Sequence, residues 1–172
     1  MLKLILNKKN TTIKSYTKIH DNVYIGENVY IHEYCNIGGI GFGHMWSKNK
    51  YMNQPHIGNV YIENNVEIFP YTNVVRGTLG TTKICKGTKI AHFCHISHEC
   101  KIDENNLIMA NSTICGSTTL GKKNVLGAGT MIKDNIKIGN NNFFGLRSSV
   151  VSPVNNKEVW GIHHAKYIKK IK

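Results

Sequence analysis

The sequence predicts an all-β solenoid, a stack of coils built from very short parallel strands. Three observations predict it. Aliphatic or aromatic residues recur every six positions, a small or polar residue stands four positions after most of them, and the same spacing occurs in three separate stretches. Because a helix repeats near 3.6 residues and an ordinary strand near 2, an unbroken period of six belongs to neither alone. It is typical of a solenoid in which each short strand is followed by a corner.

The longest stretch of this ruler runs without a slip over residues 84–150. We expect the ruler residues to fill the interior of the coils; they are Ile84, Ile90, Ile96, Ile102, Ile108, Ile114, Leu120, Leu126, Ile132, Ile138, Phe144 and Val150. The residue four positions later suits a tight corner: Thr88, Cys94, Cys100, Asn106, Ser112, Thr118, Asn124, Thr130, Asn142 and Ser148. Three hexads make one triangular coil, so residues eighteen apart are expected to stack at the strand spacing of about 4.8 Å.

The same ruler appears earlier in the chain and is interrupted twice. Its earlier positions are Ile13, Ile19, Ile25, Ile31, Ile37, Ile62, Ile68 and Val74. Residues 38–56 form a long loop that carries Phe42, His44 and Trp46, and four extra residues enter between Val74 and Ile84. A solenoid core cannot accept extra residues, so both segments should protrude, and long excursions from a rigid scaffold often carry binding groups. Alternatively, the aromatic loop packs against a neighbouring subunit.

The two ends of the chain are expected to cap the stack. Residues 2–6 offer an apolar strand that would close the first coil, and residues 157–172 would fold over the last coil as a short helix or strand. The repeat domain would thus span residues 1–156, with residues 157–172 as a C-terminal cap. The start is too short for the apolar region of a signal peptide, and no stretch approaches a membrane span. We therefore expect a cytoplasmic protein without membrane insertion.

The formal net charge of +12 comes almost entirely from lysine, since Arg76 and Arg147 are the two arginines. Nucleic acid is one partner that such a charge would suit. The lysines are scattered, however, and no aromatic and basic motif accompanies them, so the sequence does not predict nucleic-acid binding. A partner with phosphates fits better, and general lysine enrichment of the source organism's proteins is the alternative explanation.

The five cysteines are expected to be free. Three of them, Cys35, Cys94 and Cys100, occupy the small corner position, while Cys85 and Cys115 follow ruler residues. No CxxC pair exists and the number is odd, which disfavours a disulfide framework or a zinc knuckle. A reducing compartment fits this pattern.

Three histidines within seven residues, His92, His95 and His98, suggest a metal site at first sight. The ruler argues against it. His92 and His98 each stand two residues after a ruler position, so they occupy equivalent places on adjacent faces of the prism and point away from each other within one chain. Only a trimer could reunite such groups, and the sequence therefore predicts no metal site.

The hexads at these histidines resemble those of the hexapeptide-repeat acyltransferases, which form left-handed parallel β-helices. More specifically, four segments resemble UDP-3-O-acylglucosamine N-acyltransferase of lipid A synthesis: GGIGFG at 38–43, IGNVYIENNVEI at 57–68, RGTL at 76–79 and KIAHFCHISHECKI at 89–102. The segment ISHEC at 96–100 is also similar to the sugar N-acetyltransferases of the sialic-acid and bacillosamine pathways. The resemblance implies a left-handed coil, against the usual right-handed crossover rule.

Both resemblances place the family's general base on His98 and its backbone oxyanion donor on Gly116. The separation is 116 − 98 = 18 residues, one full coil, so the glycine would lie beside the histidine on the next coil. A neutral imidazole would take a proton from the attacking amine or hydroxyl, and the N–H of Gly116 would meet the developing oxyanion. Glu99 stands where the sugar N-acetyltransferases have an acid that modulates the histidine. Adjacent strand residues point to opposite sides, so a hydrogen bond between His98 and Glu99 would need a local bend or a neighbouring chain.

The resemblance also implies substrate-binding residues. The pantetheine of the acyl donor would run along the C-terminal coils beside Gly116, Ala128, Gly145 and Leu146, with Arg147, Lys166 and Lys169 as candidates for the donor's phosphates. The acceptor would contact Phe42, His44, Trp46 and His92. No tightly bound cofactor is expected, and acetyl-CoA or another acyl-CoA would be a co-substrate.

The chain also departs from these families. We expect it to lack their N-terminal uridine- or nucleotide-sugar-binding domain, and GIHHAK at 161–166 replaces their usual closing motif. The acceptor is therefore left open. The favoured hypothesis is transfer of an acetyl or other acyl group from coenzyme A to an amine or hydroxyl of a sugar, most simply a nucleotide-linked amino sugar for surface polysaccharide.

Three alternatives stay open beside this hypothesis. The first is an acyl-carrier-protein-dependent long-chain N-acyltransferase of the lipid A type, for which the basic surface would suit the acidic carrier. The second is a non-catalytic β-helix scaffold. The third is a carbonic-anhydrase-like β-helix, which requires three histidines to converge between subunits. A homotrimer is expected, because the family builds its sites between chains.

Overall fold

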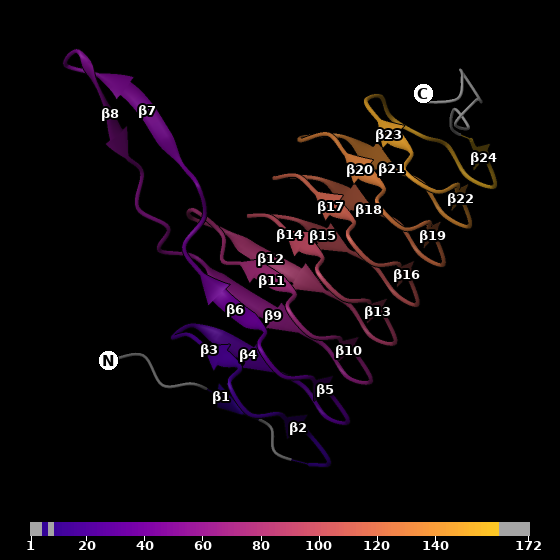
Figure 1. Ribbon diagram of the computed structural model, residues 1–172, viewed down its shortest axis with the longest axis horizontal. Coiled ribbons are helices and arrows are strands. Elements are labelled where there is room, and N and C mark those ends of the chain that lie inside the picture. The colour runs from indigo at the N-terminus through magenta and orange to yellow at the C-terminus, as the bar shows by residue number, and fades with distance from the viewer. Residues whose placement is uncertain (1–4, 7–8, 162–172) are drawn as a thin grey trace, which may run out of the picture.

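The computed structural model describes residues 5–6 and 9–161, which wind into a stack of three-sided coils (Figure 1). The strands are β1 (Ile5–Leu6), β2 (Thr12–Ile13), β3 (Lys18–Ile19), β4 (Val23–Ile25), β5 (Tyr30–Ile31), β6 (Asn36–Gly39), β7 (His44–Ser47), β8 (Lys50–Asn53), β9 (Asn59–Ile62), β10 (Glu67–Ile68), β11 (Asn73–Val75), β12 (Thr81–Ile84), β13 (Lys89–Ile90), β14 (His95–Ile96), β15 (Lys101–Ile102), β16 (Leu107–Ile108), β17 (Thr113–Ile114), β18 (Thr119–Leu120), β19 (Val125–Leu126), β20 (Met131–Ile132), β21 (Lys137–Ile138), β22 (Phe143–Phe144), β23 (Ser149–Val150) and β24 (Val159–Trp160). The described residues contain no helix, and thus none that could cross a membrane.

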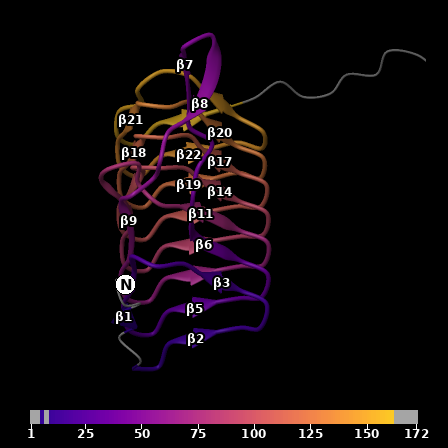
Figure 2. The same ribbon diagram turned by 90° about the vertical axis from the view of Figure 1, so that its left-hand side faces the viewer.

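Three parallel sheets form the faces of the prism, and the chain visits them in turn. Sheet A has the order β1-β4-β9-β12-β15-β18-β21, sheet B the order β2-β5-β10-β13-β16-β19-β22-β24, and sheet C the order β3-β6-β11-β14-β17-β20-β23. Strands of one sheet stack one above the next along the solenoid axis (Figure 2). We call the three edges the AB, BC and CA corners, after the sheets that the chain connects there. The prediction of a left-handed parallel β-helix is confirmed.

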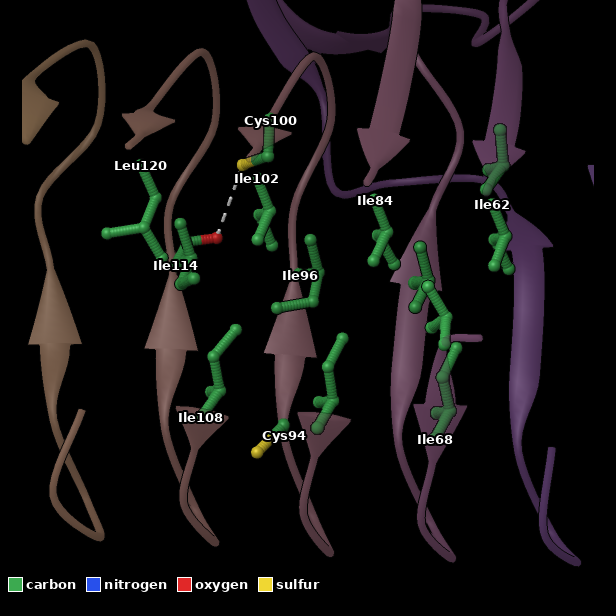
Figure 3. Close-up of a cluster of buried hydrophobic side chains, with 14 of the residues drawn as sticks. Ile62, Ile68, Ile84, Cys94, Ile96, Cys100, Ile102, Ile108, Ile114 and Leu120 are labelled. Atoms are coloured by element: carbon green, nitrogen blue, oxygen red, sulfur yellow. Dashed lines mark hydrogen bonds between the residues drawn. The ribbon is translucent and has the colours of Figure 1, made fainter. Parts of the chain in front are cut away.

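The interior of the prism is a set of stacked ruler residues, as the six-residue period predicts. The register pairs residues eighteen apart, for example Ile84 with Ile102 and Ile96 with Ile114. Every ruler side chain from residue 84 to residue 150 is at most 1% exposed. Figure 3 shows part of this continuous core, with ruler side chains between Ile62 and Leu120 pointing into it. Each buried side chain of this size contributes about 1.5–3 kcal/mol.

The small and polar corner residues are buried as well, and they pair with the backbone. Asn124 shows the pattern: its Oδ1 accepts from the N–H of Asn142 at 2.9 Å, and its Nδ2 donates to the carbonyls of Gly121 at 2.8 Å and Gly139 at 2.9 Å. Its own N–H donates to Oδ1 of Asn106 at 2.7 Å. This ladder of side chains at the AB corner satisfies polar groups that the short strands leave free.

The regular corners use a residue with positive φ, three positions after the ruler residue, and the AB and BC corners fill this position differently. The AB corner has mostly asparagine, including Asn28, Asn65 and Asn105, which tolerates this conformation well. The BC corner instead has Tyr16, Tyr34, Tyr71 and Phe93, whose rings stack at centroid distances of 5.0–5.1 Å. Bulky residues rarely adopt positive φ, so this aromatic column offsets a backbone cost by ring stacking.

Both interruptions of the ruler lie at the CA corner. The first leaves sheet C after β6 and returns at β9; it contains the antiparallel hairpin β7–β8, which stands clear of the coils (Figure 1). The sequence predicts only a loop here, but Lys48 and Asn49 both have positive φ and form the two-residue turn of a hairpin. The second interruption, residues 76–80, joins β11 to β12. The chain therefore concentrates its extra residues on one edge.

The ends of the described chain extend two of the sheets. Strand β1 pairs with β4 in sheet A, and β24 pairs with β22 in sheet B, where Trp160 packs against the core. These strands fit the predicted closure of the first and last coils. The rest of the predicted cap, with the phosphate candidates Lys166 and Lys169, lies outside the described residues.

We predict that Asn124→Ala lowers the free energy of unfolding by about 3 kcal/mol. The substitution leaves one buried N–H and two carbonyl groups without this partner, and each such loss costs about 1–3 kcal/mol. Thermal or urea unfolding would measure the change. The control is Asn53→Ala, at an exposed position of the hairpin, which should change the free energy by less than about 0.5 kcal/mol. Equal stability of the two variants would contradict the role of the ladder.

Candidate active site

His98 lies at the CA corner, directly after β14, with its ring against the next coil. A Cβ atom built on Gly116 would lie 2.5 Å from Cε1 and 2.6 Å from Nε2 of His98, well inside van der Waals contact. Because residue 116 has no side chain, the imidazole can lie flat over this backbone. The predicted one-coil stacking of His98 and Gly116 is thus present in the structure, and it requires glycine at position 116.

Glu99 holds the other side of the His98 ring. Its Oε2 lies 2.6 Å from Nδ1 of His98 within the same chain. Glu99 has a φ of 52°, the left-handed corner conformation, and this bend turns its side chain back toward its neighbour. The corner itself therefore supplies the local bend that the hydrogen bond between His98 and Glu99 needs.

The insertion at residues 76–80 fixes the carboxylate of Glu99. The backbone N–H groups of Leu79 and Gly80 both donate to Oε1 of Glu99, each at 3.1 Å. Burial opposes ionisation of this carboxyl, but the N–H of Gly80, the His98 ring and the N–H of Leu79 outweigh it and lower the pKa of Glu99 below its ordinary value. Glu99 is therefore ionised at neutral pH.

This arrangement determines which nitrogen of His98 is free. An ionised carboxylate only accepts hydrogen bonds, so Nδ1 of His98 carries the proton and donates it to Glu99. In the neutral ring Nε2 then has an unprotonated lone pair, as a general base requires. In other enzymes too, a carboxylate orients an imidazole, and the second ring nitrogen is open to act as the base.

A second imidazole, His56, packs against His98 at an interplanar angle of 73° and a centroid distance of 5.6 Å. It lies on the return from the hairpin and is 6% exposed. Its Nδ1 lies 3.1 Å from the carbonyl of Gln54, whereas its buried Nε2 has no hydrogen-bond partner among the described residues. A Cβ on Gly41 would lie 2.7 Å from this Nε2, so the glycine-rich segment 38–43 covers the ring closely.

A chain of side chains leads along sheet C to His95. Asn73 contacts Nδ1 of His95 at 3.0 Å, Asn36 donates to Asn73 at 2.8 Å, and His20 lies 2.8 Å from Asn36. Burial lowers the pKa of His95, and the nearby His98 lowers it further. His95 is therefore neutral at pH 7, and the amide column orients its ring beside the corner.

The cysteines are free, as predicted, and none of the five described is an activated nucleophile. Burial raises the pKa of Cys85 and Cys94 to about 11 and that of Cys100 to about 12. Cys115, next to Gly116, also has a raised pKa through burial and the charge of Asp134. The thiols stay protonated near neutral pH, so histidine is the better-placed base or nucleophile at this corner.

Of the residues of this loop that are predicted to bind the acceptor, His44 and Trp46 lie on strand β7 of the hairpin, and Phe42 lies just before it. Phe42 and His44 have ring centroids 4.7 Å apart and line a pocket of about 450 Å³ together with Tyr51. Trp46 packs edge-on against Tyr51 at 5.1 Å. Phe42 is 92% exposed, so these rings are free to contact a substrate or another chain.

The remaining predicted site residues lie on a different edge within this chain. His92, Ala128, Gly145, Leu146 and Arg147 all belong to the BC corner, where the chain passes from sheet B to sheet C. Sheet C separates them from His98 and Gly116. One chain therefore does not bring the predicted donor residues and the predicted base together. Lys166 lies outside the described residues.

The histidine cluster is divided in the same way. His92 belongs to the BC corner and contacts Phe69 at a centroid distance of 5.2 Å, whereas His98 belongs to the CA corner. Within residues 5–6 and 9–161, no group of three histidine, cysteine or acidic side chains could hold a metal ion.

Comparison with known proteins agrees with this geometry. A family model for "Bacterial transferase hexapeptide (six repeats)" matches residues 8–39 and 81–116, the second of which contains His98 and Gly116. The matched residues are bacterial-transferase hexapeptide repeats. This hexapeptide-repeat chain is also 40% identical over 137 residues to UDP-3-O-acylglucosamine N-acyltransferase 2 of Rhodopseudomonas palustris, an alignment that covers 80% of the chain and 37% of that relative.

Solved structures share the fold. The hexapeptide-repeat chain superposes on LpxA from Acinetobacter baumannii with a TM-score of 0.67 at 24% identity, covering 84% of this chain and 57% of the other. UDP-N-acetylglucosamine acyltransferase from Campylobacter jejuni gives a TM-score of 0.70 at 23% identity, covering 85% and 62%. The chain spans about a third of the length of the Rhodopseudomonas relative, so these similarities establish the β-helix and its repeats.

The sequence does not predict a role for two residues of the CA corner, His56 and Arg76. His56 stands in the interrupting loop, outside the ruler, where no period marks it. Arg76 donates from Nε to the carbonyl of Gly38 at 2.6 Å and from Nη2 to the carbonyl of Asp21 at 3.1 Å. These hydrogen bonds connect three successive coils. The place of Arg76 in RGTL was visible in the sequence, but its partners were not.

We predict that Glu99→Gln is less stable than the unaltered protein at neutral pH and that the difference shrinks in acid. The folded-state pKa of Glu99 is lowered, so its stabilising effect is complete above the unfolded value of about 4.3 and is lost as pH falls through the folded value. Unfolding midpoints of both proteins from pH 7 to pH 3 would measure it. A difference independent of pH would contradict the ionised state of Glu99.

Proposed function

We propose that this hexapeptide-repeat protein is an acyltransferase that moves an acyl group from a thioester donor to the amine of a nucleotide-linked amino sugar, with His98 as general base. One observation carries the proposal: the His98 ring lies between the carboxylate of Glu99, 2.6 Å from Nδ1, and the bare backbone of Gly116. This leaves Nε2 as an acceptor next to residue 116, to whose N–H we assign the oxyanion. Acyl transfer needs that combination.

In the reaction, the acceptor nitrogen attacks the thioester carbonyl carbon while Nε2 of His98 takes one proton from it. The new C–N bond gives a tetrahedral oxyanion, and the N–H of Gly116 stabilises that charge. The C–S bond then breaks, and the leaving thiolate takes the proton back from the imidazolium. The products are an amide and a free thiol, so atoms and charge balance without a further reactant.

Glu99 supports this step by holding the proton of His98 on Nδ1 and by stabilising the imidazolium that forms. The N–H groups of Leu79 and Gly80 keep the carboxylate in place. His56 closes one side of the ring and limits its rotation. General-base action is worth roughly 10²–10⁴ in rate, and one oxyanion donor roughly 10²–10³.

The acceptor class rests on the relatives. The names of the similar proteins contain UDP-linked glucosamine derivatives, and the match covers the coils that carry His98. We assign contact with such an acceptor to Phe42, His44 and Trp46, in support of which their rings are exposed or line a pocket. The chemistry needs no tightly bound cofactor, and a cytoplasmic location fits a soluble nucleotide sugar and thioester.

Acyl-CoA is the proposed donor, and a homotrimer is the proposed assembly. The predicted donor residues Ala128, Gly145, Leu146 and Arg147 lie at the BC corner, so they reach His98 if the BC corner of one chain faces the CA corner of the next. Small residues there let pantetheine approach the backbone. Acyl carrier protein is the alternative donor, since the net charge of +12 suits an acidic partner.

The proposal predicts thiol release when the protein is mixed with acetyl-CoA and a panel of UDP-linked amino sugars, and loss of that release in His98→Ala by roughly 10²–10⁴. Long-chain acyl carrier protein forms a parallel arm that identifies the donor. His32→Ala is the matched control, a half-buried histidine of the BC corner, and should keep the rate.

Two results would contradict the proposal in different ways. If His98→Ala releases thiol as fast as the unaltered protein, the assignment of the base is wrong. If neither donor reacts with any acceptor, the chain is a scaffold that keeps the coil without the chemistry.

A further inference from the structure

The outer face of sheet A carries a pocket next to the CA corner. No residue of the hairpin lines it. Its volume is about 470 Å³, and its lining residues are Tyr24, Asn59, Tyr61, Thr81, Lys83 and Lys101. The residues come from β4, β9, β12 and β15, four neighbouring strands of the sheet. The acyl-transfer step described above uses none of these six side chains.

The four long side chains of the pocket stand in one straight column along the solenoid axis. The strand register pairs Tyr24 with Tyr61, Tyr61 with Lys83, and Lys83 with Lys101. Successive members are therefore separated by one strand spacing, about 4.8 Å. Two aromatic rings are followed by two ammonium groups, in that order, from the N-terminal coils toward the coil of His98.

The aromatic half of the column suits a planar ring. The rings of Tyr24 and Tyr61 have centroids 6.1 Å apart and planes inclined by 33°, and Tyr61 is 44% exposed. Because every nucleobase has a flat π-face, an exposed tyrosine can stack a base without reading its sequence. An aliphatic ligand would gain no such stacking.

The cationic half suits phosphate. Nζ of Lys83 lies 2.7 Å from Oε1 of Glu63 and 5.6 Å from the centre of the Tyr61 ring, so its position is fixed. An ammonium has three donors, and the pairing with Glu63 leaves two of them for a ligand. Nζ of Lys101 is 3.9 Å from the carboxylate of Asp103, a loose contact that leaves it available. Two ammonium groups on adjacent strands provide donors for two linked phosphates.

The pocket also points at the active-site corner. Lys101 follows His98 by three residues on the same coil, and Thr81 directly follows Gly80, whose N–H holds Glu99. A ligand with its base over the tyrosines and its phosphates at the lysines would end at the coil of His98. Whatever is attached to the second phosphate is then carried toward the general base.

We propose that this pocket on sheet A binds the nucleoside diphosphate half of the acceptor, with the base on Tyr24 and Tyr61 and the phosphates on Lys83 and Lys101. The inference rests on the proposed function, because it gives the acceptor's sugar a position next to His98. It assigns nucleotide recognition to the coils themselves.

Calorimetric titration of the full chain with UDP, GDP, CDP and dTDP, without any acyl donor, tests the pocket. We expect at least one of them to bind, and we expect Tyr61→Ala and Lys101→Ala each to raise its Kd roughly 10-fold. The matched control is Lys137→Ala, which continues the same column of sheet A two strands beyond Lys101 and outside the pocket, and its Kd should not change.

The possible results distinguish a failure of the proposed nucleotide pocket from a failure of the proposed acyl transfer. Absence of binding by all four nucleotides, or equal Kd values in Tyr61→Ala, Lys101→Ala and the unaltered protein, overturns the pocket even if acyl transfer occurs. Equal kcat/KM for a nucleotide-linked and a free amino sugar also overturns it and leaves the transferase intact. Nucleotide binding that needs Tyr61 and Lys101, in a protein that transfers no acyl group, supports the pocket and removes the proposed reaction. Unchanged thermal unfolding of the variants confirms that they are folded.

Discussion

The eighteen-residue register of the coil is the constraint on which the rest of the structure depends. Because ruler residues such as Ile84 and Ile102 must stack in a filled core, extra residues can leave the coil only at a corner. The chain places both of its interruptions at the CA corner, between sheets C and A. The same register puts Gly116 under the ring of His98. The fold thus concentrates the irregular backbone and the candidate base on one edge.

The insertion at residues 76–80 turns this edge into an organised site. Its N–H groups hold Glu99, Glu99 orients His98, and Gly116 leaves room for the ring. His56 reaches the same ring from the other interruption. Two segments that leave the core at different points of the sequence therefore meet around one imidazole. A regular solenoid without these breaks would expose a histidine but would not orient it.

Much of this could be predicted from the sequence. The period of six gave the solenoid, the buried residues and the stacking of His98 on Gly116. Counting hexads in threes also shows that Ile37, Val74 and Ile96 all belong to the same face, so the shared corner of the two interruptions was readable. The bend at Glu99 had a signal as well, since the equivalent position at other corners is rich in asparagine, which favours positive φ.

Other features depend on contacts that no local pattern encodes. His56 lies in a segment without a period, and its burial depends on the approach of Gly41 from another part of the loop. The hairpin β7–β8 depends on the turn at Lys48 and Asn49, residues that do not mark such a turn as strongly as glycine does. By contrast, the separation of the predicted donor residues from His98 was readable in the sequence, because counting hexads in threes assigns Ala128 and Gly145 to the BC corner.

We propose that the ring of His98, which lies against the bare backbone of Gly116, is the general base of acyl transfer. The most direct measurement compares the kcat/KM for acyl transfer of Gly116→Ala with that of Gly161→Ala. A Cβ at 116 lies 2.5 Å from the ring, whereas one at 161 meets none of the described residues within 4 Å. With both variants folded, we predict a loss of at least 10²-fold for Gly116→Ala and none for Gly161→Ala. Equal activity of the two variants would contradict the account.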